Sequence, residues 1–266
     1  MTKAIAILLF ILPYFVKGQV DPLFQELIVT SPVKPSVQES EQFHDFVKAL
    51  QLKESSSQKR FLRSIFKTTQ QKFLKKYAQY SDLGEVFQTG NYDCLTATAL
   101  FSILLNETHF DYKILETNYH IFILVNTAEG EVLLETTDRL SGFVDEPDEI
   151  KNRIGSYREH KILNASNDKM YYQYSFNLFH EVTPNQLAGL LYFNQAIKAF
   201  NRNDLLTCAS FLDQSKKIYE SPRVEELAIV LVKSVLESNL SPTIKGRVIR
   251  QYKNIVLGKG SPVASR

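Results

Sequence analysis

The sequence predicts an α+β fold in which a helix packs on an antiparallel sheet, with helices before this core and helical hairpins after it. Apolar residues recur at three-and-four spacing over most of the chain, which is the periodicity of amphipathic helices. In contrast, residues 112–137 hold three short runs rich in β-branched and aliphatic residues, typical of adjacent strands. The 248 residues that follow position 18 are enough for one large or two modest domains.

The first eighteen residues have the layout of a secretory signal peptide. Lys3 supplies a positive start, residues 4–16 are predominantly apolar, and Val16 and Gly18 place small residues at the expected cleavage site. We therefore expect residues 1–18 to be removed and the mature protein to be secreted or periplasmic. The alternative is an uncleaved membrane anchor, although the apolar stretch is short for a bilayer span.

The charge balance argues against a nucleic-acid partner. Removal of the signal would take away Lys3 and Lys17, which leaves 29 of the 31 basic side chains against 29 acidic ones. Phosphate binding needs a net basic surface, and this chain would have none. After the signal no segment approaches eighteen consecutive apolar residues, so no further membrane span is expected.

Residues 19–81 are expected to form an extended lead-in and two N-terminal helices. Prolines at three positions between residues 19 and 37 predict the extended chain. Apolar spacing predicts the helices over 39–52 and 57–80, and Ser57 and its neighbours offer N-capping hydroxyls to the second.

The predicted core covers residues 82–180. Both faces of its middle strand are apolar, which predicts a strand buried on both sides beneath a helix. Glu129 and Gly130 indicate a hairpin turn. The elements are expected in this order: a helix over 93–105, strands over 112–117, 120–126 and 131–137, a helix over 145–158 and a strand over 170–179.

Residues 181–258 are expected to form helical hairpins, followed by a flexible tail over 259–266. Between residues 191 and 222, small residues stand where two antiparallel helices would touch, and this pattern resembles a tetratricopeptide-type hairpin. Helices over 224–237 and 243–257 would form a second hairpin. The small residues are Ala196, Ala199, Cys208 and Ser215.

Three residues of the core are candidates for thiol chemistry. Cys94 begins the predicted helix, where the helix field stabilises a thiolate, although the neighbouring carboxylate of Asp93 opposes this. His120 opens the middle strand and would act as the base for Cys94. Glu135 lies in the next strand and would orient His120. The alternatives are a buried structural cysteine and a core histidine with satisfied hydrogen bonds.

Two further assignments complete the candidate site. Asp138 is the alternative acid, a few residues nearer the strand end. Gln88 stands six residues before Cys94, and its amide could stabilise an oxyanion beside the Cys94 backbone N–H. The sequence holds no CxxC, no HExxH, no histidine cluster and no glycine-rich phosphate loop, so neither a metal nor a cofactor is expected.

The series of a cysteine on a helix, a histidine on a strand and an acid on the next strand resembles the transglutaminase-like core of the papain-like cysteine enzymes. The run Glu135-Thr136-Thr137 is similar to the Asp-Pro-Thr of many members, and the glutamine before the cysteine is similar to the papain arrangement. The resemblance covers residues 82–143. With its tail, the chain looks like a secreted bacterial transglutaminase-like protein.

The resemblance implies an α+β core with the cysteine, histidine and acid as catalytic residues. Two departures weaken any transfer of substrate: the chain has no tryptophan, and its acid is glutamate rather than aspartate. The first expectation is a secreted amide-bond enzyme, a cysteine peptidase, amidase or transamidase acting through a thioester on a peptide or protein. The alternative is an inactive adaptor that binds a protein partner through its helical tail. A third is a cell-envelope structural module with Cys94 and Cys208 in a disulfide.

Overall fold

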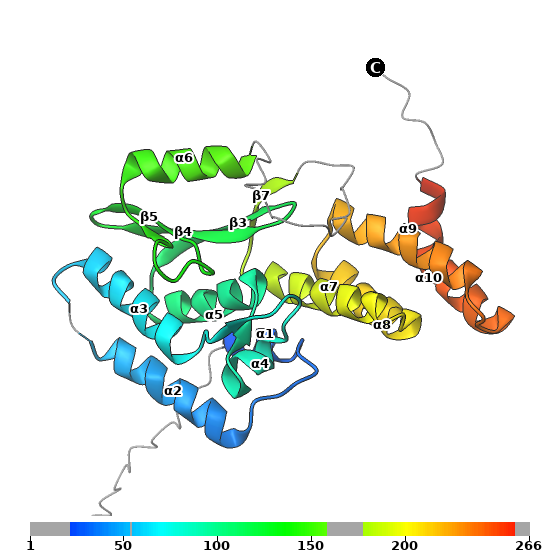
Figure 1. Ribbon diagram of the computed structural model, residues 1–266, viewed down its shortest axis with the longest axis horizontal. Helices are drawn as coiled ribbons and strands as arrows, with labels where there is room; N and C mark the ends of the chain where they lie inside the picture. Colours follow the sequence, from blue (N-terminus) through cyan, green and yellow to red (C-terminus); the bar gives the residue numbers. More distant parts are fainter. Residues whose placement is uncertain (1–21, 54, 159–177, 259–266) are drawn as a thin grey trace, which may run out of the picture.

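The computed structural model describes residues 22–53, 55–158 and 178–258. The predicted signal peptide and the predicted tail lie outside these residues. The fold class is α+β, as predicted, with helices packed on an antiparallel sheet. In Figure 1 the layers run from helix α6 through the sheet to α5 and α3, with the other N-terminal helices below and α7–α10 to one side.

Five strands form the sheet, in the order β6-β5-β4-β3-β7, and every neighbouring pair is antiparallel. The central hairpin joins β4 to β5 through a tight turn, in which Gly130 has a positive φ of 109°. The register places Ile123 opposite Leu134, so the start of β4 and the end of β5 lie at the same end of the hairpin. The strands are β3 (Asp111–Thr117), β4 (Ile121–Thr127), β5 (Gly130–Leu134), β6 (Phe143–Val144) and β7 (Phe179–Val182).

Each face of the sheet is covered by one helix. Helix α5 (Cys94–Glu107) packs on the face that presents Ile121, Ile123 and Val125, within the main apolar core. Helix α6 (Pro147–Arg158) covers the opposite face, where Phe122 and Leu124 form a second, smaller cluster. The alternation along β4 explains both contacts, since successive side chains of a strand point to opposite faces.

Residues 19–37 differ from the expected extended lead-in because they include helix α1 (Pro22–Ile28). Proline is compatible with a helix start, and four buried residues follow at helical spacing. Helix α2 (Val37–Gln51) lies close to its expected position, with Ser36 as its N-cap. Helix α3 (Gln58–Lys72) begins after the N-cap Ser57 as expected.

Helix α3 ends eight residues before its predicted end at position 80. Phe73 and Leu74 are consecutive buried residues, and the chain then enters β1 (Lys76–Tyr77). This short strand pairs in parallel with β2 (Asn91–Tyr92). Between the two strands lies helix α4 (Leu83–Gln88), which the apolar periodicity did not predict. Tertiary pairing therefore overrides local helix preference over residues 73–80.

Two helical hairpins follow the sheet. The first consists of α7 (Gln186–Asn201) and α8 (Leu205–Ile218), and the second of α9 (Pro222–Glu237) and α10 (Pro242–Gly258). Each predicted helix pair is present, and all four predicted small residues are buried. The predicted strand over 170–179 lies mostly outside the described residues; the strand that is described, β7, continues to Val182.

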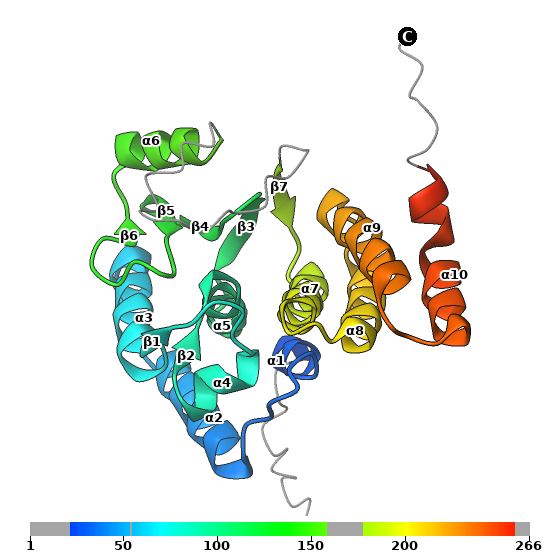
Figure 2. The same ribbon diagram turned by 45° about the vertical axis from the view of Figure 1, so that its right-hand side comes forward.

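The hairpins are continuous with the core. Strand β7 leads almost directly into α7, which packs against α5 and α1 (Figure 2). A single cluster of buried apolar side chains runs from Leu23 in α1 to Tyr252 in α10. Within the described ranges, no helix has the length and apolar character needed to cross a membrane.

Candidate active site

Cys94 is the first residue of α5, and its position is set by a cap at the helix start. The side chain of Asp93 accepts a hydrogen bond from the backbone N–H of Thr96 at 2.8 Å, and Thr96 Oγ1 accepts from the N–H of Asp93 at 2.9 Å. This reciprocal capping box fixes the first turn. Cys94 is partly exposed, whereas Asp93 is buried.

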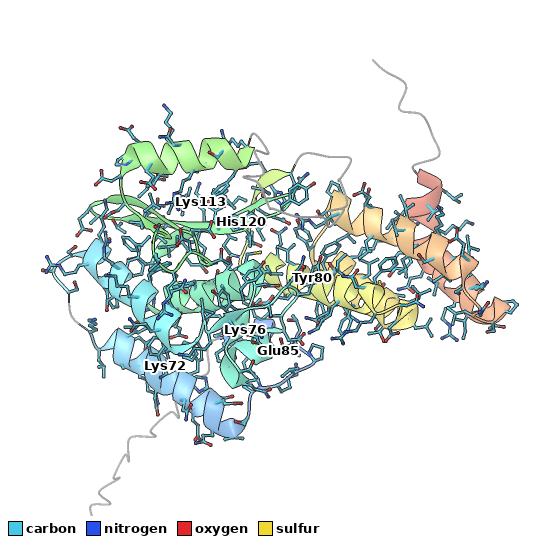
Figure 3. All side chains as sticks on the ribbon, viewed as in Figure 1. Lys72, Lys76, Tyr80, Glu85, Lys113 and His120 are labelled. Atoms are coloured by element: carbon cyan, nitrogen blue, oxygen red, sulfur yellow. The ribbon has the colours of Figure 1, made fainter. Side chains whose placement is uncertain are left out.

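His120 ends the tight loop between β3 and β4. Its backbone N–H donates to Oγ1 of Thr117 at 3.0 Å, and the N–H of Thr117 donates to the carbonyl oxygen of His120 at 2.7 Å. These two hydrogen bonds fix the backbone of His120 and thereby restrict the position of its imidazole. Figure 3 shows His120 at the end of the sheet that lies nearest the C-terminal helices.

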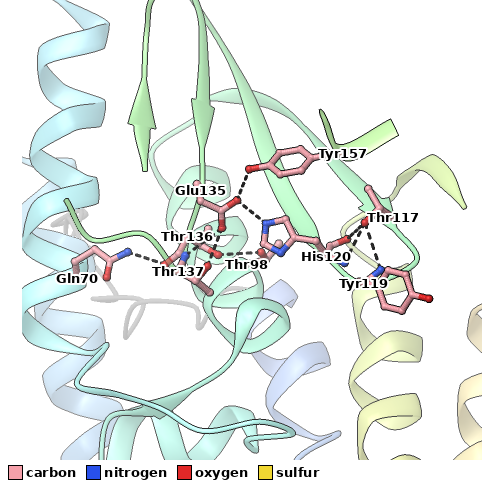
Figure 4. A network of polar contacts seen from close by, with 9 residues as sticks. All are labelled: Gln70, Thr98, Thr117, Tyr119, His120, Glu135, Thr136, Thr137 and Tyr157. Atoms are coloured by element: carbon pink, nitrogen blue, oxygen red, sulfur yellow. Dashed lines mark hydrogen bonds and ion pairs between the residues drawn. The ribbon is translucent and has the colours of Figure 1, made fainter. Parts of the chain in front are cut away.

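Glu135 follows β5 directly and lies beside His120. Its Oε2 is 2.5 Å from Nε2 of His120 and accepts a hydrogen bond from the hydroxyl of Tyr157 at 3.0 Å (Figure 4). Its Oε1 accepts from the hydroxyl of Thr137 at 2.8 Å. The carboxylate is therefore held by three side chains, and His120 is oriented by it.

Cys94 lies beside His120 in the same cleft and contributes to the raised pKa of the imidazole. Since Nε2 of His120 contacts Glu135, Nδ1 is the nitrogen that remains for Cys94. Burial opposes the charged imidazole, but the hydrogen bonds and charges of Cys94 and Glu135 outweigh it and raise the pKa of His120 to about 10. The structure thus brings Cys94, His120 and Glu135 together in one continuous series.

The pKa values of Glu135 and Asp93 shift in opposite directions. Burial would raise the pKa of Glu135, but the hydrogen bonds from His120, Thr137 and Tyr157 and the charge of His120 lower it. For Asp93 burial prevails and raises the pKa, against the hydrogen bonds from Thr96, Leu95 and Asn194. Glu135 is accordingly the stable anion of the site.

A cleft of about 380 Å³ opens over Cys94 and His120. One wall comes from the core, namely the segment Tyr77–Tyr80, the start of α5 and the loop before His120. The other wall comes from α7 and α9, which contribute Leu190, Phe193 and Arg223 among others. The thiol therefore lies at a boundary between the sheet domain and the helical hairpins, not on an isolated surface.

Two of the sequence-predicted site residues lie elsewhere. The amide nitrogen of Gln88 donates to the carbonyl oxygen of Lys34 at 2.7 Å, and Gln88 does not line the cleft, so its assignment as an oxyanion donor is wrong. Gln88 is the last residue of helix α4. Asp138 accepts from the backbone N–H groups of Leu140 and Ser141, and the acid that contacts His120 is Glu135.

Sequence reasoning missed several residues that the structure places at the site. Gln79 lines the cleft in the loop after β1, where its side chain is exposed. Tyr157 reaches Glu135 from α6. Asn194 and Arg223 reach the cleft from helices about 100 residues downstream of Cys94 and His120. The sequence carries no local signal for these contacts.

The two cysteines are both free thiols, so the disulfide of the third expectation is absent. Cys208 is completely buried in the first hairpin, and burial raises its pKa to about 12. In the part of the chain that the structure describes, no group of three or more His, Cys, Asp or Glu side chains is placed to hold a metal ion.

Comparisons of the chain with protein-family models, with curated proteins and with solved structures gave no match.

Proposed function

We propose that the chain is a thiol-dependent amide-bond enzyme in which Cys94 is the nucleophile, His120 the proton carrier and Glu135 the orienting acid. The observation that carries the proposal is the 2.5 Å contact of His120 with the buried carboxylate of Glu135, together with the place of Cys94 beside His120 in one cleft. Such a series activates a thiol and holds its base in one tautomer. The cleft above it gives a substrate carbonyl access to the sulfur.

The proposed reaction has two halves. The thiol proton resides on Nδ1 of His120 before the attack, and the sulfur of Cys94 then attacks the amide carbonyl carbon and forms a C–S bond. The C–N bond then breaks, the imidazolium donates its proton to the leaving amine, and a thioester remains. A water molecule or an amine attacks the thioester and gives its proton to His120, and the C–S bond breaks. Water as acceptor makes a hydrolase and an amine makes a transamidase.

We propose two donors for the oxyanion of these steps. The backbone N–H of Cys94 lies in the first turn of α5, where N–H groups have no acceptor within the helix. The second is the side-chain amide of Gln79, a residue that lines the same cleft. Loss of one such donor costs about 100-fold or more in turnover. Gln79→Ala should therefore reduce turnover, whereas Gln88→Ala, outside the cleft, should not.

The wider assignment follows from the same site. The order of a thiol helix, a histidine strand and an acid strand supports a transglutaminase-like core of the papain-like class. The proposed substrate is a peptide or protein outside the cytoplasm, since the first eighteen residues resemble a secretory signal.

Alkylation by iodoacetamide between pH 5 and 9, read by mass spectrometry, tests the proposal without a known substrate. We expect Cys94 to be labelled rapidly well below pH 8.5, the reference pKa of a free thiol being about 8.5. Labelling should slow at least about tenfold in His120→Ala, since the activating imidazole is lost. Cys208 is an internal control that should stay unlabelled in the folded protein, because it is fully buried.

An inert Cys94, or a labelling profile unchanged in His120→Ala, would contradict the proposal. That result would favour the adaptor, in which the core is only a scaffold. Once a substrate is found, Cys94→Ser should abolish turnover while it leaves the thermal midpoint almost unchanged.

A further inference from the structure

Helix α7 binds Asp93, the residue that precedes the candidate nucleophile Cys94. Nδ2 of Asn194 donates to Oδ2 of Asp93 at 2.8 Å. The other oxygen of the same carboxylate caps α5 through the N–H of Thr96. Asn194 therefore fixes the cap from which the Cys94 side chain projects into the cleft.

Helix α9 holds the loop that precedes the candidate base. Nη2 of Arg223 donates to the carbonyl oxygens of Thr117 at 2.7 Å and Asn118 at 3.2 Å, and lies 2.9 Å from Oε1 of Glu116. The side chain of Arg223 is only 12% exposed and that of Glu116 only 3%, so the pair is screened from water. Three consecutive residues before the His120 turn are thus bound by one guanidinium.

Glu116 fixes the guanidinium in turn. It accepts a hydrogen bond from the hydroxyl of Tyr219, and Nε2 of His180 lies 3.5 Å from its Oε2. Tyr219 comes from the end of α8 and His180 from β7. The orientation of Arg223 is therefore determined by both the sheet and the first hairpin.

The loop transmits this constraint to His120. Thr117 accepts from Arg223 through its carbonyl oxygen, and its hydroxyl accepts from the backbone N–H of His120. A shift of the Thr117 backbone must therefore move the imidazole relative to Cys94. Misplacement of a reacting group by about 1 Å can cost about 100-fold in rate.

We propose, on the basis of the proposed function, that Asn194 and Arg223 are positioning residues that hold Cys94 and His120 at reacting distance. Asn194 acts on the nucleophile and Arg223 on the base, from two helices of the same layer. The helical hairpins are then a structural half of the active site, and their first role is to set the geometry of the thiol and imidazole.

Alkylation profiles of variants test this role. We compare Asn194→Ala with the double variant Glu116→Gln/Arg223→Gln, which leaves no unpaired buried charge. Lys198→Ala is the matched control, because Lys198 binds Asp82 at 2.8 Å from the same helix α7 but does not line the cleft. At pH 6.5 we expect Cys94 labelling to slow at least tenfold in both test variants. Their pH midpoints should move toward that of His120→Ala, whereas Lys198→Ala keeps the parental profile.

Arg223→Lys gives a graded result, since one ammonium group cannot bind three acceptors in a fixed geometry. Its labelling rate should fall between those of the parent and the double variant. Test variants that fold, as judged by near-ultraviolet circular dichroism, and that keep the parental rate and midpoint would overturn the inference.

Hydrogen exchange separates this inference from the proposed function. Exchange of the His120 amide reports the loop whether or not Cys94 is reactive. It should quicken about tenfold in the double variant relative to Lys198→Ala. If the labelling rate of Cys94 in the parent does not depend on His120, the proposed enzyme is refuted. The role of Arg223 in positioning the loop is then still tested by the exchange rate of the His120 amide. An amide that exchanges at the parental rate in the double variant would refute the role of Arg223.

Discussion

Tyr157 donates its hydroxyl hydrogen bond to Oε2 of Glu135 at 3.0 Å, the same oxygen that contacts His120. Its ring packs on Phe122 with centroids 4.9 Å apart, on the sheet face opposite α5. Burial raises the pKa of Tyr157, and the charge of Glu135 adds to this effect, so the phenol remains a donor. Helix α6 therefore supports the acid from one face of the sheet while α5 presents the thiol from the other.

Tyr157→Phe should lower the free energy of unfolding by about 2 kcal/mol, the typical contribution of a hydrogen bond to a charged acceptor. The pKa of Glu135 should rise, because Tyr157 is one of the donors that lower it. Urea denaturation at pH 7 measures the first effect. Tyr112→Phe is the control, since it loses a bond to the neutral carbonyl oxygen of Ser102 and should cost about 1 kcal/mol. Equal losses in the two variants would contradict a charged acceptor at Glu135.

The His120–Glu135 pair should stabilise the fold over a limited pH range. The pKa of Glu135 is lowered in the folded state, so its contribution is present above the unfolded value of about 4.3 and is lost as the pH falls further. The pKa of His120 is raised to about 10, so its contribution is complete below about pH 6.5 and is lost as the pH rises toward 10. The slope on the alkaline side is at most about 1.4 kcal/mol per pH unit, the limit for one bound proton.

Unfolding free energies of the parent and of His120→Gln/Glu135→Gln, measured from pH 3 to 10, check this range. The difference between them should be largest between about pH 5 and 6.5 and should shrink on both sides. A difference independent of pH would mean that the pair is not charged in the folded protein.

Alanine should have opposite effects at two helical glycines. A Cβ atom at Gly189 would lie 2.3 Å from Cβ of Tyr219, whereas a Cβ at Gly155 meets no atom within 4 Å. Gly155→Ala should raise stability by up to about 1 kcal/mol through helix propensity. Gly189→Ala should lower it by about 1–3 kcal/mol through overpacking. The thermal midpoints of both variants, compared with that of the parent, test this prediction. A higher midpoint in Gly189→Ala would show that α7 can move away from Tyr219.

The cleft should prefer substrates that are uncharged beside the scissile carbonyl. Its charged side chains are already paired within the protein: Asp93 with Asn194, Glu116 with Arg223, and His120 with Glu135. A charged substrate group would have to be desolvated without a new partner, which is costly. Peptidyl chloromethyl ketones ending in phenylalanine should label Cys94 at least tenfold faster than those ending in aspartate or lysine. Equal rates would contradict this preference.

Local patterns predicted much of the fold and the centre of the site. The alternation along β4 and the hairpin to β5 fix which residues lie at the same end of the two strands. His120 and Glu135 therefore had to lie close together. The helix start at Cys94 was readable from Asp93 as an N-cap. Helix α4 was not predicted, although Asp82 and Glu85 form a capping signature at its start with a 3.2 Å hydrogen bond.

Other features depend on contacts between distant segments. Gln79 and Gln88 are equally polar in sequence, and only the turn of the chain after β1 decides which of them faces the cleft. Helix α3 stops at Lys72 because the next residues pair with β2. Arg223 reaches the His120 loop across about 100 residues, and no local pattern encodes such a contact.

The distance in sequence between His120 and Arg223 has a consequence for the synthesis of the protein. His120 leaves the ribosome 103 residues before Arg223, which corresponds to roughly 5–20 s at ordinary elongation rates. Until α7 and α9 have emerged, the thiol and the imidazole lack the wall that closes the cleft. The nascent chain would therefore carry all three reactive side chains without their final geometry, and competence would arise only once α9 has emerged.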